Sequence, residues 1–226
     1  ILLVPDVHGR EFWKRAKDFV NSYEWIIFLG DYLDPYPWEG ITPEEAFDNF
    51  KEVIEFKKEN MDKVILLIGN HDYHYIDLDF MDCSRLDYKN RKAIHAVFEE
   101  NKDLFKLGFQ YLDEKYDYLF THAGVYEEWL NKNGLVFENV LYGDVSPEAL
   151  SQVSIWRGGC DEVSSCIWAD IHEVYDNEPA RGFIQYVGHT QQHEHPFKTK
   201  AITCIDCRRL FELDTKNNKL IKISDD

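Results

Sequence analysis

The sequence lacks long hydrophobic runs and has few basic residues. Its longer apolar stretches, such as Val64–Ile68, fall far short of the roughly 20 residues that cross a bilayer, which argues against a transmembrane helix. Lys and Arg number 25 against 42 Asp and Glu, for a formal net charge of -17. Long nucleic acid and anionic lipid bind surfaces rich in Lys and Arg, so this balance argues against a protein that coats either. It leaves open a single local pocket that accepts an anion.

Cysteine is also scarce, and its number is odd. Five cysteines in a chain of 226 residues indicate reduced thiols in a cytosolic protein rather than a disulfide scaffold. Cys204 and Cys207 have the CxxC spacing of redox and zinc sites, but no second CxxC accompanies them and their flanks are typical of a strand. No secretory signal is visible. The chain begins at Ile1 rather than Met, which leaves open whether a segment precedes it.

Three strand–helix units occupy the first 70 residues. Each predicted strand is a short apolar run that stops at a polar loop, as buried strands do. These runs lie at residues 1–4, 25–29 and 64–68. Residues 10–21 place apolar side chains near one helical face, and Thr42 followed by Pro43 is a helix start, for a helix that runs to about Asn60. The alternation predicts an α/β (α+β) fold with parallel strands joined by right-handed crossovers.

The rest of the chain is predicted to mix helices and strands. Helices are expected at 89–100, 126–132 and 147–156, and strands at 116–120 and 183–187. The end should form a β-meander, with strands at 201–205, 208–214 and 220–223. No repeat or low-complexity linker divides the sequence. We therefore predict one domain over residues 1–226, with loop-rich insertions near 73–90 and 133–180.

Five of the predicted strands give way to a tight loop that carries Asp, Asn or His. In an α/β sheet, loops at the carboxyl ends of parallel strands meet over one crevice. Six side chains should therefore gather there: Asp6, His8, Asp31, Asn70, His122 and His189. Oxygen and imidazole donors without thiolate suit Mn²⁺, Zn²⁺ or Fe better than a closed structural zinc site. Each loop alone is ordinary turn chemistry, whereas the ordered set D-x-H, G-D-x-x-D, G-N-H-D, H and G-H is highly specific.

With these motifs in this order, the sequence resembles the calcineurin-like metallophosphoesterases. Within them it is most similar to the phosphoprotein phosphatase branch, which also holds the bacterial diadenosine tetraphosphatases. His122-Ala123-Gly124 resembles the H-x-G loop of that branch, and Trp168-Ala169-Asp170 resembles its W-x-D segment. The resemblance implies a four-layer sandwich of two mixed central β-sheets flanked by helices, with a dinuclear metal site that hydrolyses phosphate esters.

The resemblance also implies which residues hold the two metal ions. Asp31 would bridge them. The first ion would be held by Asp6, His8 and Asp31, and the second by Asp31, Asn70, His122 and His189. Two divalent ions about 3.5–4 Å apart need such a carboxylate to offset their repulsion, and they lower the pKa of a shared water. We expect Mn²⁺, with Fe or Zn²⁺ as alternatives.

His71 follows a predicted ligand directly, so it is the candidate general acid for the leaving oxygen. Asp34 is the natural partner to orient that imidazole. Simple loop packing of His71 is the alternative.

Two residues that the resemblance would lead one to expect are absent. Pro35 follows Asp34 where the branch commonly has the arginine that binds phosphate, so the substrate must be held in another way. Arg157 and Arg10 are the candidate replacements, and each is otherwise an ordinary surface arginine. Gln191 stands where many metallophosphoesterases have a second metal-binding histidine, so His193 would bind a metal only with an altered loop.

These features together favour metal-dependent hydrolysis of a phosphate ester. The substrate is a phosphoprotein, a dinucleoside polyphosphate or other nucleotide, or a small phosphate ester. Tyr32–Trp38 either stacks on a nucleobase, covers the cleft or is simply a structured loop. The alternative enzyme is a phosphodiesterase or nuclease of the same superfamily, although the net charge disfavours long nucleic acid. A non-catalytic scaffold is disfavoured because no ligand is missing. We expect a cytoplasmic protein with no membrane partner.

Overall fold

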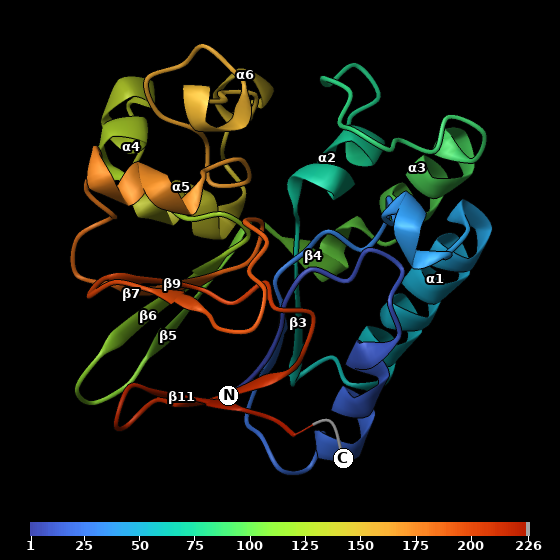
Figure 1. Cartoon of the computed structure of the whole chain (residues 1–226), viewed down its shortest axis with the longest axis horizontal. Coiled ribbons are helices and arrows are strands. Elements are labelled where there is room, and N and C mark those ends of the chain that lie inside the picture. The colour runs from blue at the N-terminus through green and yellow to red at the C-terminus, as the bar shows by residue number, and fades with distance from the viewer. Residues whose placement is uncertain (225–226) are drawn as a thin grey trace.

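The computed structural model describes residues 1–224 and contains two mixed β-sheets (Figure 1). The first sheet has the order β11-β10-β1-β2-β3-β4 and the second β5-β6-β7-β9-β8. The strands of the first sheet are β1 (Leu2–Val4), β2 (Ile26–Phe28), β3 (Val64–Leu67), β4 (Phe105–Lys106), β10 (Phe211–Asp214) and β11 (Lys219–Lys222). Those of the second are β5 (Gly108–Leu112), β6 (Asp117–Thr121), β7 (Ile184–Val187), β8 (Phe197–Lys198) and β9 (Ile202–Cys204).

The parallel pairing predicted for the first three strands is confirmed. Strands β1, β2, β3 and β4 pair in parallel in the first sheet, as do β6, β7 and β9 in the second. The predicted C-terminal β-meander is wrong, because β9 belongs to the second sheet whereas β10 and β11 pair antiparallel in the first. Ile205 and Cys207 are buried in the core between the sheets, so the chain crosses from one sheet to the other there instead of turning back.

The helices agree with the sequence in part. The α-helices are α1 (Pro43–Glu59), α2 (Asn70–Ile76), α3 (Arg91–Glu100), α4 (Glu127–Asn133), α5 (Phe137–Tyr142) and α6 (Pro147–Leu150). The 3₁₀ helices are η1 (Phe12–Phe19), η2 (Pro37–Glu39), η3 (Lys102–Leu104), η4 (Ile155–Arg157) and η5 (Ile171–Tyr175). At the start of α1, the Thr42 side chain accepts a hydrogen bond from the Glu45 amide, and the Glu45 carboxylate accepts one from the Thr42 amide.

The helix predicted at 147–156 is interrupted, because side chains take the amide donors that it would need. The Asp161 carboxylate accepts from the Val153 amide at 3.0 Å, and the Ser164 hydroxyl accepts from the Ser154 amide at 2.8 Å. The segment therefore divides into α6 and η4. Helix α2 was not predicted, and it makes Asn70 and His71 helical residues rather than loop residues.

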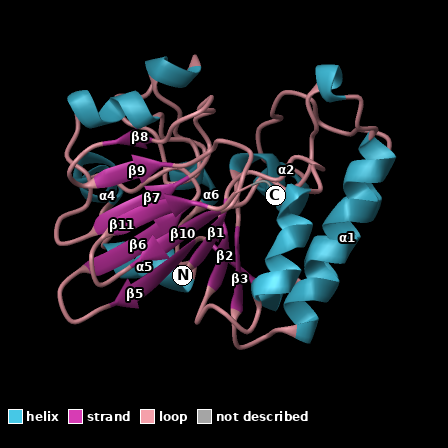
Figure 2. Ribbon diagram, turned by 60° about the horizontal axis from the view of Figure 1, so that its bottom comes forward, coloured by secondary structure: helices cyan, strands magenta, loops and turns pink. Residues whose placement is uncertain are grey.

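Three apolar cores separate four layers, with helices on the outer faces of the paired sheets (Figure 2). Leu2 and Val4 of β1 pack under α1, α3 and η1, whereas Leu3 between them faces the second sheet. Strands β2 and β3 alternate in the same way. Because both faces of these strands are covered, their sequences are uninterrupted apolar runs. The four-layer sandwich of two mixed sheets is confirmed.

The layers place the predicted donor loops together. Strands β1, β2 and β3 end at Val4, Phe28 and Leu67, and β6 and β7 of the other sheet end at Thr121 and Val187.

Residues 77–90 continue from α2 without helix or strand. None of the helices in residues 1–224 is long and apolar enough to cross a membrane.

Candidate active site

All six predicted metal ligands come together at the carboxyl ends of the strands. Five of them are almost fully buried, and His189 is partly buried. The ligand atoms of Asp6, His8 and Asp31 lie within 4.8 Å of one another, and so do those of Asp31, His122 and His189. Asp31 thus belongs to both groups. This arrangement places a carboxylate where the sequence predicts a bridging ligand.

Main-chain carbonyls orient two of the imidazoles. His8 Nδ1 lies 2.7 Å from the Leu33 carbonyl oxygen, and His122 Nδ1 lies 2.7 Å from that of Leu29. A carbonyl can only accept, so each Nδ1 carries the proton. The Nε2 atom of each ring then faces Asp31, at 3.5 Å from its Oδ2 atom. Such second partners fix the tautomer and ring direction that a metal-binding histidine needs.

The groups around His122 Nε2 attract positive charge. Its Nε2 atom lies 3.1 Å from Asn70 Oδ1, which is an acceptor, and 3.1 Å from His189 Nδ1, which accepts when the proton of the neutral ring is on Nε2. Burial works to lower the pKa of His122, but Asp31 and Asp6 raise it to about 9. Burial and the nearby Arg157 hold the pKa of His189 well below its usual value. The donors therefore surround a position that attracts positive charge, which fits a divalent metal ion.

Close backbone packing supports this geometry. His8, Asp31, Asp34 and His189 all have positive φ angles, between 45° and 63°. This conformation is costly for residues other than glycine and tends to occur at functional sites. Gly188 packs directly against the Asp6 carboxylate, where any Cβ atom would collide with Oδ1. The glycine beside His189 is therefore required by close approach.

Asp72 joins the second and third donor loops. Its side chain is fully buried. Its Oδ2 atom accepts hydrogen bonds from the amides of Asp31 at 2.7 Å and Gly69 at 2.8 Å, and its Oδ1 atom accepts one from the Tyr32 amide at 3.0 Å. One carboxylate therefore satisfies three amides beside the predicted metal ligands.

Replacing Asp72 by Ala is expected to lower the free energy of unfolding by about 3–6 kcal/mol, because three amides would be buried without an acceptor. Urea denaturation would measure this loss. Asp79→Ala, which changes an exposed acid a few residues along the chain, is the control and should change stability by less than about 0.5 kcal/mol. A loss at Asp72 no larger than that of the control would contradict the role assigned to its carboxylate.

The structure brings His71 and Asp34 into direct contact. Asp34 Oδ2 lies 2.8 Å from His71 Nδ1, and the Tyr75 hydroxyl donates to Asp34 Oδ1 at 2.5 Å. The same Oδ2 atom lies 3.0 Å from Nε2 of His74, which is fully buried. Although burial opposes it, hydrogen bonds from His71 and His74 lower the pKa of Asp34. Asp34 is thus a buried carboxylate held between two imidazoles.

His74 is a partner of Asp34 that the sequence reasoning missed. It lies three residues after His71, which places both on one face when the segment is helical. The helix itself was not predicted, so this spacing carried no weight in the sequence.

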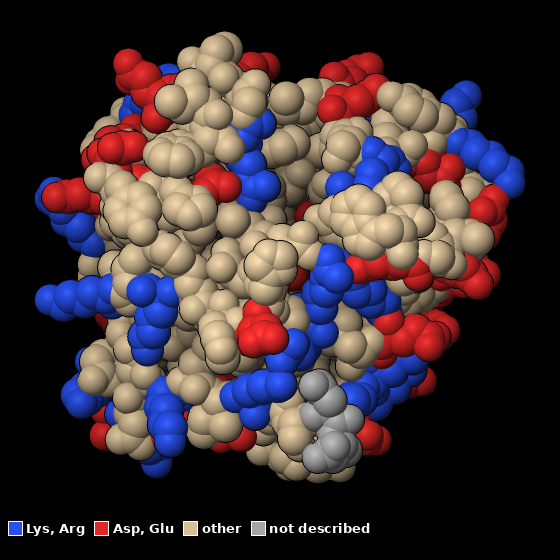
Figure 3. All heavy atoms as spheres, viewed as in Figure 1, with Lys and Arg blue, Asp and Glu red and all other residues tan. Residues whose placement is uncertain are grey.

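A cavity of about 330 Å³ opens beside His71 and several of the predicted metal ligands. It is lined by His8, Asp31, Tyr36, Asn70, His71, Asp82, Cys83, Ser84, Arg85, Arg157, Trp168 and His189. Figure 3 shows a hollow in the upper part of the molecule, with Lys or Arg side chains (blue) on its border. Basic side chains at such a border make the local potential more positive than the acidic composition alone suggests.

The two arginines predicted to bind substrate differ in position. Arg157 lines the cavity, where its Nη2 atom donates to Thr190 Oγ1 at 2.7 Å and its Nε atom lies 2.9 Å from Asp170 Oδ2. Arg10 is not among the lining residues, and its Nε atom donates to both carboxylate oxygens of Glu39, at 3.0 and 3.1 Å. The structure therefore brings only Arg157 of this pair to the cavity.

Arg85 lines the same cavity and was not predicted. It comes from the segment 77–90, and no motif in the sequence marks it. Asp206 is a further buried acid near the centre, and burial and Asp6 raise its pKa well above the usual range. It follows β9 as the predicted donors follow their strands, so the strand-end pattern is the signal that marks it.

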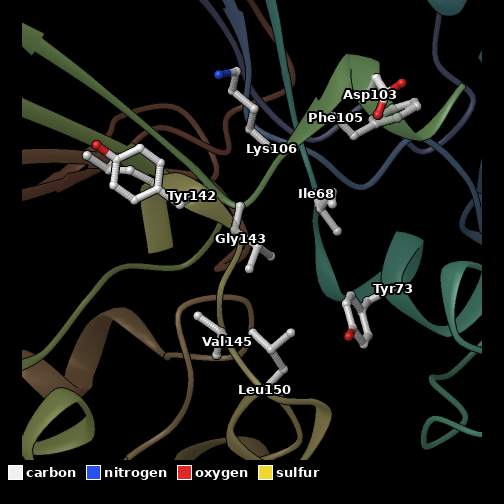
Figure 4. Close-up of a pocket in the computed structure, with 11 residues that line it drawn as sticks. Ile68, Tyr73, Asp103, Phe105, Lys106, Tyr142, Gly143, Val145 and Leu150 are labelled. Atoms are coloured by element: carbon white, nitrogen blue, oxygen red, sulfur yellow. The ribbon is translucent and has the colours of Figure 1, made fainter. Parts of the chain in front are cut away.

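Other candidates lie outside the donor clusters. His193 is exposed and belongs to none of the possible metal-binding groups found in residues 1–224. Cys204 and Cys207 are buried, and burial raises the pKa of both thiols, so neither favours the thiolate that metal binding or redox chemistry needs. A separate cavity of about 360 Å³, lined in part by Ile68, Tyr73 and Tyr142, contains no imidazole (Figure 4).

Comparisons with known proteins agree with this arrangement. A family model described as calcineurin-like phosphoesterase matches residues 1–193. A cold-active protein tyrosine phosphatase superposes with a TM-score of 0.52 at 15% identity, covering 98% of this chain and 75% of the other. A protein serine/threonine phosphatase from Saccharomyces cerevisiae gives 0.50 at 13% identity, covering 100% and 80%. At these identities the likeness shows a shared fold. No curated protein sequence matches.

Proposed function

The chain belongs to the calcineurin-like phosphoesterase family, and from this premise we propose that it is a metal-dependent phosphomonoesterase with a dinuclear centre. The observation that carries the proposal is the position of Asp31, whose carboxylate belongs to two groups of donors with ligand atoms within 4.8 Å. A carboxylate shared in this way suits two cations that would otherwise repel each other. Buried acids and imidazoles without thiolate favour Mn²⁺, with Fe and Zn²⁺ as the alternatives.

Each donor has a proposed place. Asp6, His8 and Asp31 would hold one ion, and a second would be held by Asp31, Asn70, His122 and His189. When bound, such ions neutralise charge on a phosphate ester and make a water nucleophilic near neutral pH. The chain itself orients the donors, through the carbonyls that fix His8 and His122 and through the hydrogen bonds that Asp72 accepts.

The chain also supplies a proton donor. Asp34 holds the Nδ1 side of His71, which leaves Nε2 toward the cavity that His71 lines. From there His71 would give a proton to the oxygen that leaves phosphorus. Arg157 is the better supported of the two predicted substrate-binding arginines, because it lines the cavity and Arg10 does not.

The first test is hydrolysis of p-nitrophenyl phosphate by the protein reconstituted with Mn²⁺, Fe²⁺ or Zn²⁺. We expect activity that a chelator removes and Mn²⁺ restores, with elemental analysis showing about two ions per chain. Bis-p-nitrophenyl phosphate, assayed in parallel, should be the poorer substrate. A preference for the diester would favour the phosphodiesterase alternative, and no hydrolysis with any metal would rule out the proposal. Phosphopeptides and dinucleoside polyphosphates would then identify the substrate class.

A further inference from the structure

Arg85 brings a guanidinium group into the wall of the active-site cavity. Its Nε atom donates to the Asp34 main-chain oxygen at 2.9 Å, and its Nη2 atom lies 3.2 Å from His71 Nε2. The guanidinium carbon lies 4.0 Å from the ring centroid of Tyr36. These contacts hold the side chain between the second donor loop and the proposed proton donor.

The charge of Arg85 is not matched by an acid. Among the ion pairs within residues 1–224, none joins Arg85 to a carboxylate, whereas Arg157 pairs with Asp170 and Arg10 with Glu39. The protein is rich in acids, with 42 Asp and Glu residues, yet none of those in residues 1–224 forms an ion pair with Arg85. A partly buried guanidinium with donors to spare is suited to an anionic ligand, and its planar fork matches phosphate oxygens.

The backbone at Arg85 also points to a functional position. Its φ angle is 67°, in the left-handed region that His8, Asp31, Asp34 and His189 share. Such a conformation persists in a residue other than glycine only where surrounding contacts enforce it. Here the Arg85 side chain is held by its contacts with Asp34, His71 and Tyr36.

We propose that Arg85 binds the phosphoryl group of the substrate. This role rests on the proposed hydrolysis of phosphate monoesters and adds to it the residue that grips the anion. Pro35 follows Asp34, so the second donor loop itself supplies no guanidinium at that point. The segment 77–90 supplies one from outside and anchors it on the same loop, through the Asp34 carbonyl. Since arginine only donates, His71 Nε2 is the acceptor of the present contact and carries no proton there. A bound phosphate oxygen would take over the Arg85 donor, and Nε2 would then be free to carry the proton that His71 is proposed to give to the leaving oxygen.

The test compares Arg85→Ala and Arg85→Lys with the parent protein, all loaded with Mn²⁺. In the alanine variant, KM for p-nitrophenyl phosphate should be higher by about 10- to 100-fold. Its affinity for inorganic phosphate, measured by calorimetry, should fall by a similar factor. Lysine should restore only part of the affinity, because a point charge does not present the bidentate fork. Added guanidinium ion should partly rescue the alanine variant. Metal content should stay at the parent level.

Lys89→Ala is the matched control, since it removes one positive charge from the same segment at an exposed position. It should leave KM and phosphate affinity unchanged. If Arg85→Ala retains the parent KM and phosphate affinity, or loses only kcat, the proposal fails while the hydrolase function stands. If the parent hydrolyses nothing but binds phosphate through Arg85, the function fails and the anion site stands. If the alanine variant does not fold, Arg85→Lys and Arg85→Gln supply the same comparison.

Discussion

Replacing Asp31 by Asn is expected to reduce kcat/KM for phosphate monoesters by at least about 10³-fold, corresponding to a loss of about 4 kcal/mol. Asp31 is the acid shared by the two donor groups, and its Oδ2 atom lies 3.5 Å from the Nε2 atoms of both His8 and His122. The neutral amide would remove the negative charge that is proposed to hold two cations together. Elemental analysis should accordingly find fewer than two bound ions per chain.

The control for this experiment is Asp62→Asn, an exposed acid just before β3. It should retain the parent activity and metal content. The hydrogen bond from the residue 31 amide to Asp72 is unchanged by the substitution, so the variant should stay folded. Thermal unfolding would check this. An Asp31→Asn protein that keeps two ions and most of its activity would contradict the dinuclear assignment.

Replacing His71 by Gln should lower kcat for an alkyl phosphate, such as phosphoserine, by about 10²- to 10⁴-fold. An alkoxide leaves poorly without a proton, so a proton donor matters most for this substrate. p-Nitrophenolate leaves readily, so the same variant should lose much less activity on p-nitrophenyl phosphate. The ratio of the two losses, measured with equal metal loading, is the decisive quantity.

A purely structural role for His71 would lower both activities equally, and that result would contradict the assignment. His195→Gln, at an exposed position outside the cavity, serves as the control. Asp34→Asn should follow the same pattern more weakly, because it disturbs the orientation and charge of the imidazole but leaves the proton donor in place.

The clustering of the proposed metal ligands could be predicted from the sequence because each lies at a boundary that local patterns mark well. Val4, Phe28 and Leu67 end strands that are apolar on both faces, and a polar loop must follow a strand of this kind. The ligand loops thus follow from short-range information. The role of His71 depends on its contact with Asp34, which the motifs anticipated and the structure brings within 2.8 Å.

The errors arose where distant residues decide the local structure. The Asp161 and Ser164 side chains interrupt the predicted helix at 147–156 by binding amides from outside it. Likewise, β9 and β10 belong to different sheets because the chain at Ile205 enters the core between them. Neither contact leaves a trace in the periodicity of the segment that it changes.

The sequence alone therefore determined the donor set, the order of the donors and the layered fold. Short apolar strands and the polar loops that follow them depend on residues that are close together in the chain. Only the tertiary structure decided which cations face the cavity. Arg10 lies beside the first donor loop but is neutralised by Glu39, whereas Arg85 arrives from a segment without regular structure. Its path depends on contacts with Tyr36, Asp34 and His71, between 14 and 51 residues away in the chain, and such contacts form only once the layers have packed.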